Sequence, residues 1–210
     1  MPAPVILQDV FHALRGELGE EDTGVTFDNG PAPLDRIDVM IHRAAEPAGV
    51  TVFTTIGMSA HAMPPADGPD GPVGPVGPDG RSDGRPGGRA ELRLHRRGVL
   101  DQASEGGIAM RLANLATYPW ANGRPLGWGE VLSFQDDTPT FPACARAFLA
   151  GPWLQGQPSF LETREGPVRV LHVVPITEQE RAAALATTPE SFFGDLLERR
   201  DVLLHPSQHP

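Results

Sequence analysis

The sequence predicts an α+β domain with a largely antiparallel or mixed central sheet that is flanked by helices at both ends of the chain. Apolar residues recur with helical spacing near both termini, whereas the middle of the chain holds short alternating or β-branched stretches that are typical of strands. Such segregation indicates α+β architecture instead of alternating βαβ units. A chain of 210 residues with 40% hydrophobic residues also suits one core.

The first expected element is an amphipathic helix close to the N-terminus. Its apolar positions are Ile6, Leu7, Val10, Phe11, Leu14 and Leu18. Gly19 is placed to end this helix, and a turn-rich passage around 29–33 follows it. Two strands are then expected, an alternating one at 36–42 and a β-branched one at 49–56.

A segment rich in proline and glycine follows the second strand, from 64 to 89. Glycine recurs there at every third position, in Gly68, Gly71, Gly74, Gly77 and Gly80. This is the period of collagen, but so few triplets cannot hold a triple helix together, so we expect a disordered loop. Alternation resumes at 90–95, which predicts that the loop is inserted between two neighbouring strands of one sheet.

The second half of the chain adds a helix, more strands and a helical end. A helix is expected at 104–118, with Ser104 as its N-cap and Pro119 as its stop. Thr177 and Glu180 have the spacing of a capping box, which predicts a helix start, and Thr188 precedes another. Further strands are expected at 130–134, 143–149 and 168–174, the last of them central.

The expected organisation is therefore one domain over 1–203, interrupted by the flexible loop at 64–89. Residues 204–210 are expected to form a frayed tail. The chain has one cysteine, so it cannot form an internal disulfide, and it shows neither a signal peptide nor an apolar run of membrane-spanning length. A cytoplasmic location is the prediction.

The charge balance narrows the classes of partner. The chain has 17 basic residues, all arginine, against 27 carboxylates, for a formal net charge of −10. This disfavours attachment to nucleic acid or to an anionic membrane, whereas an acidic surface can steer a basic protein partner. The acidity is concentrated in residues 1–40, which hold eight carboxylates and two arginines.

Candidate catalytic chemistry is confined to one short motif. Gly57, Met58 and Ser59 begin like a nucleophile elbow, with His61 close behind. The second glycine of that elbow is replaced by His61, and the disordered loop follows where a supporting helix is needed. A serine hydrolase that uses Ser59 and His61 therefore remains a minor alternative.

No cofactor and no metal site is predicted. The seven histidines are scattered, although His42, His95 and His172 fall on expected strands and could converge if those strands were neighbours. Cys144 lies beside an apolar run without an adjacent base, so we expect a small buried hydrophobic residue.

Two aromatic residues and an acidic pair are the candidate partner contacts. Trp120 and Trp128 lie in Gly/Pro-rich links, where aromatic side chains often anchor interfaces, and Asp136 and Asp137 form an acidic pair in a turn-like context. The alternative is that the tryptophans cap the ends of the core.

The order of several motifs resembles the suppressor-of-fused-like domain over about residues 30 to 200. The matching segments are T-V-F-T-T-I-G-M-S at 51–59 with Met63 behind it, A-E-L-R-L at 90–94, L-A-N-L-A-T-Y-P at 112–119, a tryptophan-glycine turn at Trp128, and V-L-H-V-V-P-I-T-E-Q-E at 170–180. The collagen-like insertion departs from the usual pattern, and nothing matches the additional C-terminal domain of the animal members.

The resemblance implies a non-enzymatic α+β domain that binds another protein. Small bacterial members are regarded as immunity proteins of polymorphic toxin systems, so a basic toxin domain is one candidate partner, with occlusion as the mechanism. The alternative is an intracellular regulatory or scaffold protein that sequesters another protein. The resemblance marks these residues as structural: Gly57, Met58, Ser59, Glu91, Tyr118, Pro119, Pro175, Thr177 and Glu180. The oligomeric state stays open.

Overall fold

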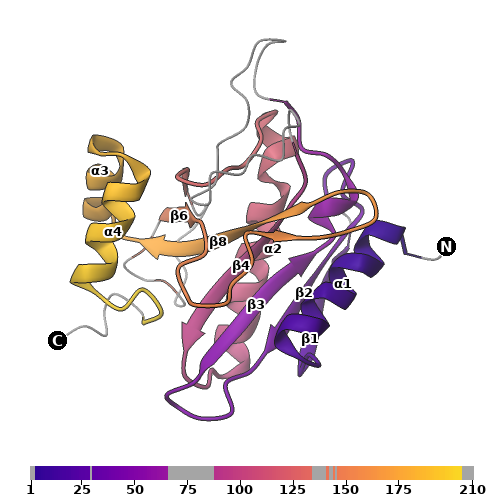
Figure 1. Cartoon of the computed structure of the whole chain (residues 1–210), viewed down its shortest axis with the longest axis horizontal. Helices are drawn as coiled ribbons and strands as arrows, with labels where there is room; N and C mark the ends of the chain where they lie inside the picture. Colours follow the sequence, from indigo (N-terminus) through magenta and orange to yellow (C-terminus); the bar gives the residue numbers. More distant parts are fainter. Residues whose placement is uncertain are drawn as a thin grey trace.

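The computed structural model describes residues 3–28, 30–65, 88–133, 141, 144 and 146–204. Within them the chain forms an eight-stranded sheet in the order β1-β2-β3-β4-β8-β6-β5, with β7 paired to β8 (Figure 1). The strands are β1 (Thr23–Asp28), β2 (Arg36–His42), β3 (Val50–Ile56), β4 (Ala90–Arg97), β5 (Val131–Ser133), β6 (Arg146–Ala150), β7 (Phe160–Leu161) and β8 (Val168–Ile176). The helices are α1 (Val5–Leu18), the short 3₁₀ helix η1 (Met58–Ala60), α2 (Gln102–Asn122), α3 (Glu178–Ala186) and α4 (Pro189–Arg199). The predicted α+β class is confirmed.

The sheet is mixed, because one central pair of strands is parallel. The pairs β1–β2, β2–β3 and β3–β4 are antiparallel, whereas β4 and β8 are parallel. Strands β6 and β7 both pair antiparallel with β8. Strand β8 contacts three other strands and is buried along its whole length, as its apolar run predicts. The Pro/Gly-rich segment joins the neighbouring strands β3 and β4, as expected, although its positions 66–87 lie outside the described residues.

Strand β1 was not predicted. It pairs with β2 in an unbroken register from Thr23↔Ile41 to Asp28↔Arg36. Its apolar residues Val25 and Phe27 alternate with exposed Gly24, Thr26 and Asp28, so the strand carries too little apolar surface to stand out in the sequence. The two-residue strand β7 was missed as well.

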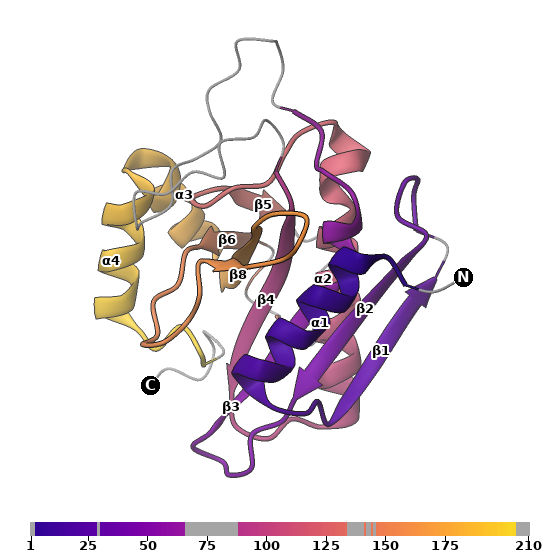
Figure 2. The same ribbon diagram turned by 45° about the vertical axis from the view of Figure 1, so that its right-hand side comes forward.

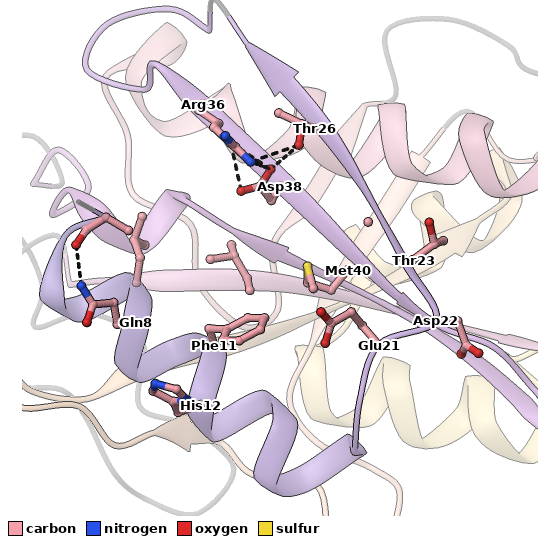
Figure 3. Close-up of a pocket in the computed structure, with 14 residues that line it drawn as sticks. Gln8, Phe11, His12, Glu21, Asp22, Thr23, Thr26, Arg36, Asp38 and Met40 are labelled. Atoms are coloured by element: carbon pink, nitrogen blue, oxygen red, sulfur yellow. Dashed lines mark hydrogen bonds and ion pairs between the residues drawn. The ribbon is translucent and has the colours of Figure 1, made fainter. Parts of the chain in front are cut away.

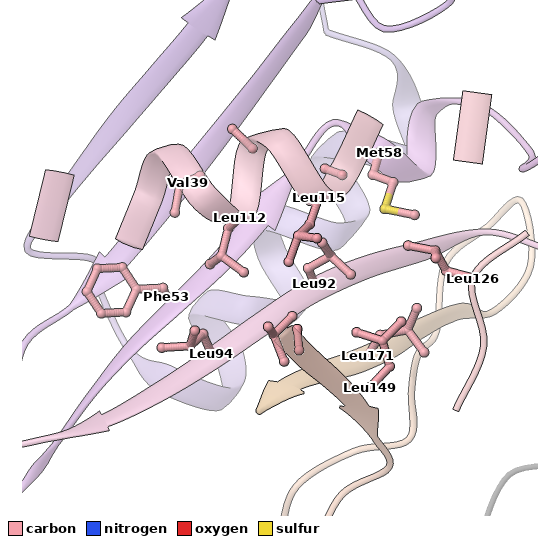
Figure 4. Close-up of a cluster of buried hydrophobic side chains, with 14 of the residues drawn as sticks. Val39, Phe53, Met58, Leu92, Leu94, Leu112, Leu115, Leu126, Leu149 and Leu171 are labelled. Carbon is pink, nitrogen blue, oxygen red and sulfur yellow. The ribbon is translucent and has the colours of Figure 1, made fainter. Parts of the chain in front are cut away.

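Helix α2 covers one face of the sheet and supplies one wall of the largest core cluster (Figure 4). Two predicted boundaries are wrong. Asp101, not Ser104, is the N-cap, because its carboxylate accepts the Ser104 amide hydrogen at 2.7 Å. Pro119 does not stop the helix: it lacks only its own amide donor, and its carbonyl still accepts hydrogen bonds from Gly123 and Arg124.

Helices α1 and α4 cover different ends of the opposite face of the sheet (Figure 2). Helix α1 buries Ile6, Val10 and Leu14 against β3 and β8 at one end. Helix α4 buries Phe192 and Leu196 against β6 and β8 at the other.

The predicted capping box is confirmed: the Thr177 hydroxyl and the Glu180 carboxylate each accept the other residue's amide hydrogen at the start of α3. The predicted frayed tail is outside the described residues from 205 onward. Among the described helices, none has the length and apolar character that a membrane crossing requires.

Candidate functional site

The elbow-like motif folds into a buried turn that one carboxylate holds. Glu91 Oε1 accepts hydrogen bonds from the Gly57 amide at 3.0 Å, the Ser59 amide at 2.9 Å and the Ser59 hydroxyl at 2.6 Å. Its Oε2 accepts the Thr55 hydroxyl at 2.7 Å. Gly57 has φ 138°, and a Cβ there would lie 2.6 Å from the Arg36 carbonyl oxygen, so glycine is required.

This geometry gives no support to the hydrolase alternative. Ser59 is fully buried and its hydroxyl donates to Glu91, whereas the His61 side chain is exposed. A nucleophile must be reachable by the substrate and hydrogen-bonded to its base. Burial raises the pKa of Glu91, while the four hydrogen bonds act in the opposite direction. The motif therefore ties the end of β3 and the turn that follows it to β4.

Two of the three strand histidines converge. His95 on β4 and His172 on β8 stack with their ring centres 5.3 Å apart, and the Trp153 ring meets both of them edge-on. His42 lies two strands away on β2, so it does not join them. In the part of the chain that the structure describes, no group of three metal-ligating side chains is present. Burial lowers the pKa of His95 to about 3 and holds the pKa of His172 well below its usual value.

Cys144 is buried, as predicted, and burial raises the pKa of its thiol to about 11. A thiol with a raised pKa is a poor nucleophile at neutral pH. It therefore behaves as a small apolar residue in the main core cluster.

Of the four predicted partner contacts, the two tryptophans lie in described parts of the chain and the two aspartates do not. Trp128 is 9% exposed, and its indole nitrogen donates to the Val170 carbonyl at 3.3 Å. Trp120 is partly buried against the main core cluster. Asp136 and Asp137 lie outside the described residues. The burial of the two tryptophans favours the alternative in which they complete the core.

Three further family-motif residues, Pro175, Thr177 and Glu180, lie where β8 leads into α3. The Pro175 carbonyl and the Glu180 carboxylate both accept from the Arg200 guanidinium, at 2.8 Å and 2.7 Å. Tyr118 lies in the last part of α2, just before Pro119. These contacts agree with a structural role, since they fix the turn between β8 and α3.

Two surface grooves of similar size flank the helices on the face opposite α2. The first, which we call the edge groove, is defined by Leu7, Phe11, Asp22, Gly24, Met40 and Ile56 and has a volume of about 540 Å³ (Figure 3). The second, which we call the aromatic groove, is defined by Trp128, Phe148, Trp153, Pro189, Phe193 and Leu197 and has a volume of about 550 Å³. Protein-binding surfaces use either sheet edges or aromatic anchors, so both grooves are candidates.

The edge groove lies between α1 and the outermost strands of the sheet. Leu7 and Phe11 form its helical wall, and Met40 lies between that wall and β1 (Figure 3). Toward one end, Asp38 accepts hydrogen bonds from the Thr26 hydroxyl at 2.6 Å and from the Arg36 guanidinium at 3.0 Å. The sequence offered two signals for this site, the acidity of residues 1–40 and the alternation around Val25 and Phe27, but β1 itself was not recognised.

The comparisons with known proteins agree on one fold family. The family model described as suppressor of fused protein (SUFU) matches residues 33–207, whereas no curated protein matches the sequence. A SUFU homologue from Neisseria gonorrhoeae FA 1090 is 16% identical, with a TM-score of 0.67 over 94% of this chain and 92% of its own. A chain of the Sufu-Fu complex is 16% identical, with a TM-score of 0.63 over 96% and 86%. Drosophila Suppressor of Fused is 15% identical, with a TM-score of 0.68 over 99% of this chain, which spans about half (51%) of the Drosophila chain.

Proposed function

The chain belongs to the suppressor of fused family, and from that premise we propose that it acts by binding another protein and catalyses no reaction. The observation that carries this proposal is the similarity to a chain of the Sufu-Fu complex, a member of the same family solved with a protein partner. The burial of Ser59 against Glu91 supports the second half, because the one nucleophile-like motif has a structural use.

We further propose that the partner is a basic toxin domain, which the chain neutralises by occluding its active surface. The formal net charge of −10 supports this, since complementary charge accelerates encounter and disfavours wrong partners. The alternative, regulation by sequestering another intracellular protein, uses the same binding chemistry and differs only in what the bound partner does.

The direct experiment is capture followed by reconstitution. A tagged chain is used in its native host to isolate a stoichiometric partner, which is identified by mass spectrometry, purified and titrated against the chain by calorimetry. The immunity proposal predicts that the partner arrests growth when expressed alone and that co-expression of the chain restores growth. Binding to a harmless partner would favour sequestration instead.

Catalysis is tested in parallel. The proposal predicts no turnover of ester or amide substrates by the wild-type chain. Turnover that disappears in a folded Ser59→Ala variant would contradict it and would restore the hydrolase alternative.

A further inference from the structure

We propose that the outer edge of β1 and the edge groove beside it bind an extended, basic segment of the partner protein, which joins the sheet as an additional strand. The inference rests on the proposed protein-binding function and specifies the surface and the chemistry of the segment. Three features of the described residues support it: an open strand edge, an uncovered groove and an excess of negative charge.

Strand β1 ends the sheet with an open edge. It pairs with β2 on one side, and no strand among the described residues pairs with its other side. Such an edge presents unpaired amide and carbonyl groups that a further strand can use. Natural edges are usually protected by charged side chains, above all lysine, by proline or by a bulge, and the one charged residue of β1 is Asp28 at its end. The six residues of β1 include neither proline nor a basic residue, and their register with β2 contains no bulge.

The groove next to this edge is not filled by α1. Helix α1 packs its buried residues against Ile56, Val168 and Val170, and it crosses the sheet on the inner side of β1 (Figure 2). A Cβ added at Gly24 would make only ordinary contacts, with the Met40 sulfur at 3.5 Å and the Val39 carbonyl oxygen at 3.8 Å. Side chains of an added strand that point to the α1 side would lie beside Gly24 and Thr26 and enter the groove.

The charges around the edge and the groove select a basic segment. Asp22 accepts the Arg43 backbone amide, and the Arg43 guanidinium, which also interacts electrostatically with Asp22, is held by two hydrogen bonds to Glu105. Arg36 is already bound to Asp38, and Arg15 lies between two glutamates. The charged side chains concerned are five carboxylates and three guanidinium groups, namely Glu20, Glu21, Asp22, Asp28, Asp38, Arg15, Arg36 and Arg43. The excess of carboxylates attracts arginine and lysine side chains and repels acidic ones.

The aromatic groove lacks these properties. It is lined by β6, which pairs with β8 on one side and β5 on the other, so no strand can be added there. It offers side-chain surface alone, and it serves as the internal control for the test below.

The probe is a fluorescent peptide of about nine residues that alternates arginine and valine, so that one face of its extended form is basic. Fluorescence anisotropy is measured against the full chain at low and at moderate salt. We expect saturable binding that weakens as salt is added, and binding at least about tenfold weaker for the same peptide with glutamate in place of arginine. Equal affinity for the two peptides, or no binding of either, would overturn the proposal.

Two variants assign the binding to this surface. Gly24→Val places a β-branched side chain in the groove without a backbone clash, so the chain should fold normally and bind the arginine peptide at least about tenfold more weakly. Glu21→Gln combined with Asp28→Asn removes two charges and should weaken binding several-fold while flattening its salt dependence. The matched control is Leu197→Ala in the aromatic groove, which should bind like the wild type. Binding unchanged in both edge variants, or lost in the control alone, would contradict the assignment.

The same variants separate this inference from the proposed function. If Gly24→Val still captures the natural partner with wild-type affinity, the chain is a binding protein but β1 is not its docking edge. If the wild type captures no partner and binds no peptide, the proposed function fails together with the inference.

Discussion

The edge groove and the aromatic groove lie on the same face of the sheet and have similar volumes, yet they are built in different ways. The helix beside the edge groove, α1, is fixed in part by a buried ion pair: Arg93 is fully buried and binds Glu17 through two hydrogen bonds of 2.6 Å and 2.9 Å. The helix beside the aromatic groove, α4, packs Phe192 and Leu196 into an apolar cluster. Its ion pair, Arg200–Glu180, lies at the C-cap, outside that packed face.

The two surfaces should therefore respond to different substitutions. Apolar packing is insensitive to charge. In a buried ion pair, removal of one partner leaves the other as an uncompensated buried charge, which destabilises the fold. The edge groove also lies beside an unpaired strand edge and an excess of carboxylates, while the aromatic groove offers a mainly apolar side-chain surface with Glu190 among its lining residues. A substitution in one region should leave the other region unchanged, so each region is the reference for the other.

The largest effect is expected from Phe192→Ala in α4. Phe192 is 1% exposed and packs edge-on against Phe148, with ring centres 5.0 Å apart. Its truncation should lower the free energy of unfolding by about 3–5 kcal/mol in a denaturant titration. Hydrogen exchange should accelerate in α4 and stay unchanged in β1. Equal acceleration in both regions would show that they do not respond independently.

Glu17→Gln should have the next largest effect, because it leaves the buried Arg93 without its anion. The free energy of unfolding should fall by about 3 kcal/mol. This is the low end of the range for breaking a buried ion pair, because the Glu17 side chain is 21% exposed. Faster exchange should appear in α1 and not in α4. The matched control is Glu20→Gln, which removes the exposed partner of Arg15 and should leave the unfolding midpoint unchanged. A loss in the control as large as in Glu17→Gln would contradict the special role of the buried pair.

A smaller, pH-dependent effect is expected beside the aromatic groove. His172 takes up a proton in the unfolded chain near its usual pKa, but burial depresses its pKa in the folded chain, so its contribution to stability is lost as pH falls below about 6.5. Replacement by phenylalanine keeps an aromatic ring beside His95 and Trp153 and removes the titration.

The test is the difference in unfolding free energy between the wild type and His172→Phe. As pH falls from roughly 6 to 5, the wild type should lose about 1.4 kcal/mol of unfolding free energy relative to the variant for each pH unit. Carboxylates that titrate in both proteins cancel in this difference. A difference independent of pH would mean that His172 is charged in the folded chain.

The smallest effect is expected from Leu197→Ala. Leu197 is 39% exposed on the rim of the aromatic groove, so its truncation should cost less than about 1 kcal/mol in the same titration. A large loss would show that the rim is part of the core and would weaken the contrast between the two grooves.

The fold was predictable where local patterns and tertiary packing agree. The stripe of α1, the β-branched strand β3 and the capping box of Thr177 and Glu180 all appear where the sequence places them. The extent of α2 was missed because Asp101 competes with Ser104 as a cap and because a single proline near a helix end is tolerated.

The candidate site was less predictable, for a physical reason. An edge strand buries little, so β1 lacks the strong apolar alternation that reveals β2 and β3. Trp128 drew attention as an exposed anchor because its sequence context is rich in glycine, but its contact with the Val170 carbonyl depends on β8, which is distant in the sequence. The acidity of residues 1–40 was visible, yet only the sheet order places it beside an open edge.

The most direct test of a binding role for β1 is hydrogen exchange of the full chain with and without the arginine-valine peptide, and then with the natural partner. Strand addition predicts slower exchange of amides in β1 and little change in β6 and α4, because only β1 gains main-chain hydrogen bonds. Slower exchange at β6 and α4, with β1 unchanged, would contradict the account and would assign binding to the aromatic groove.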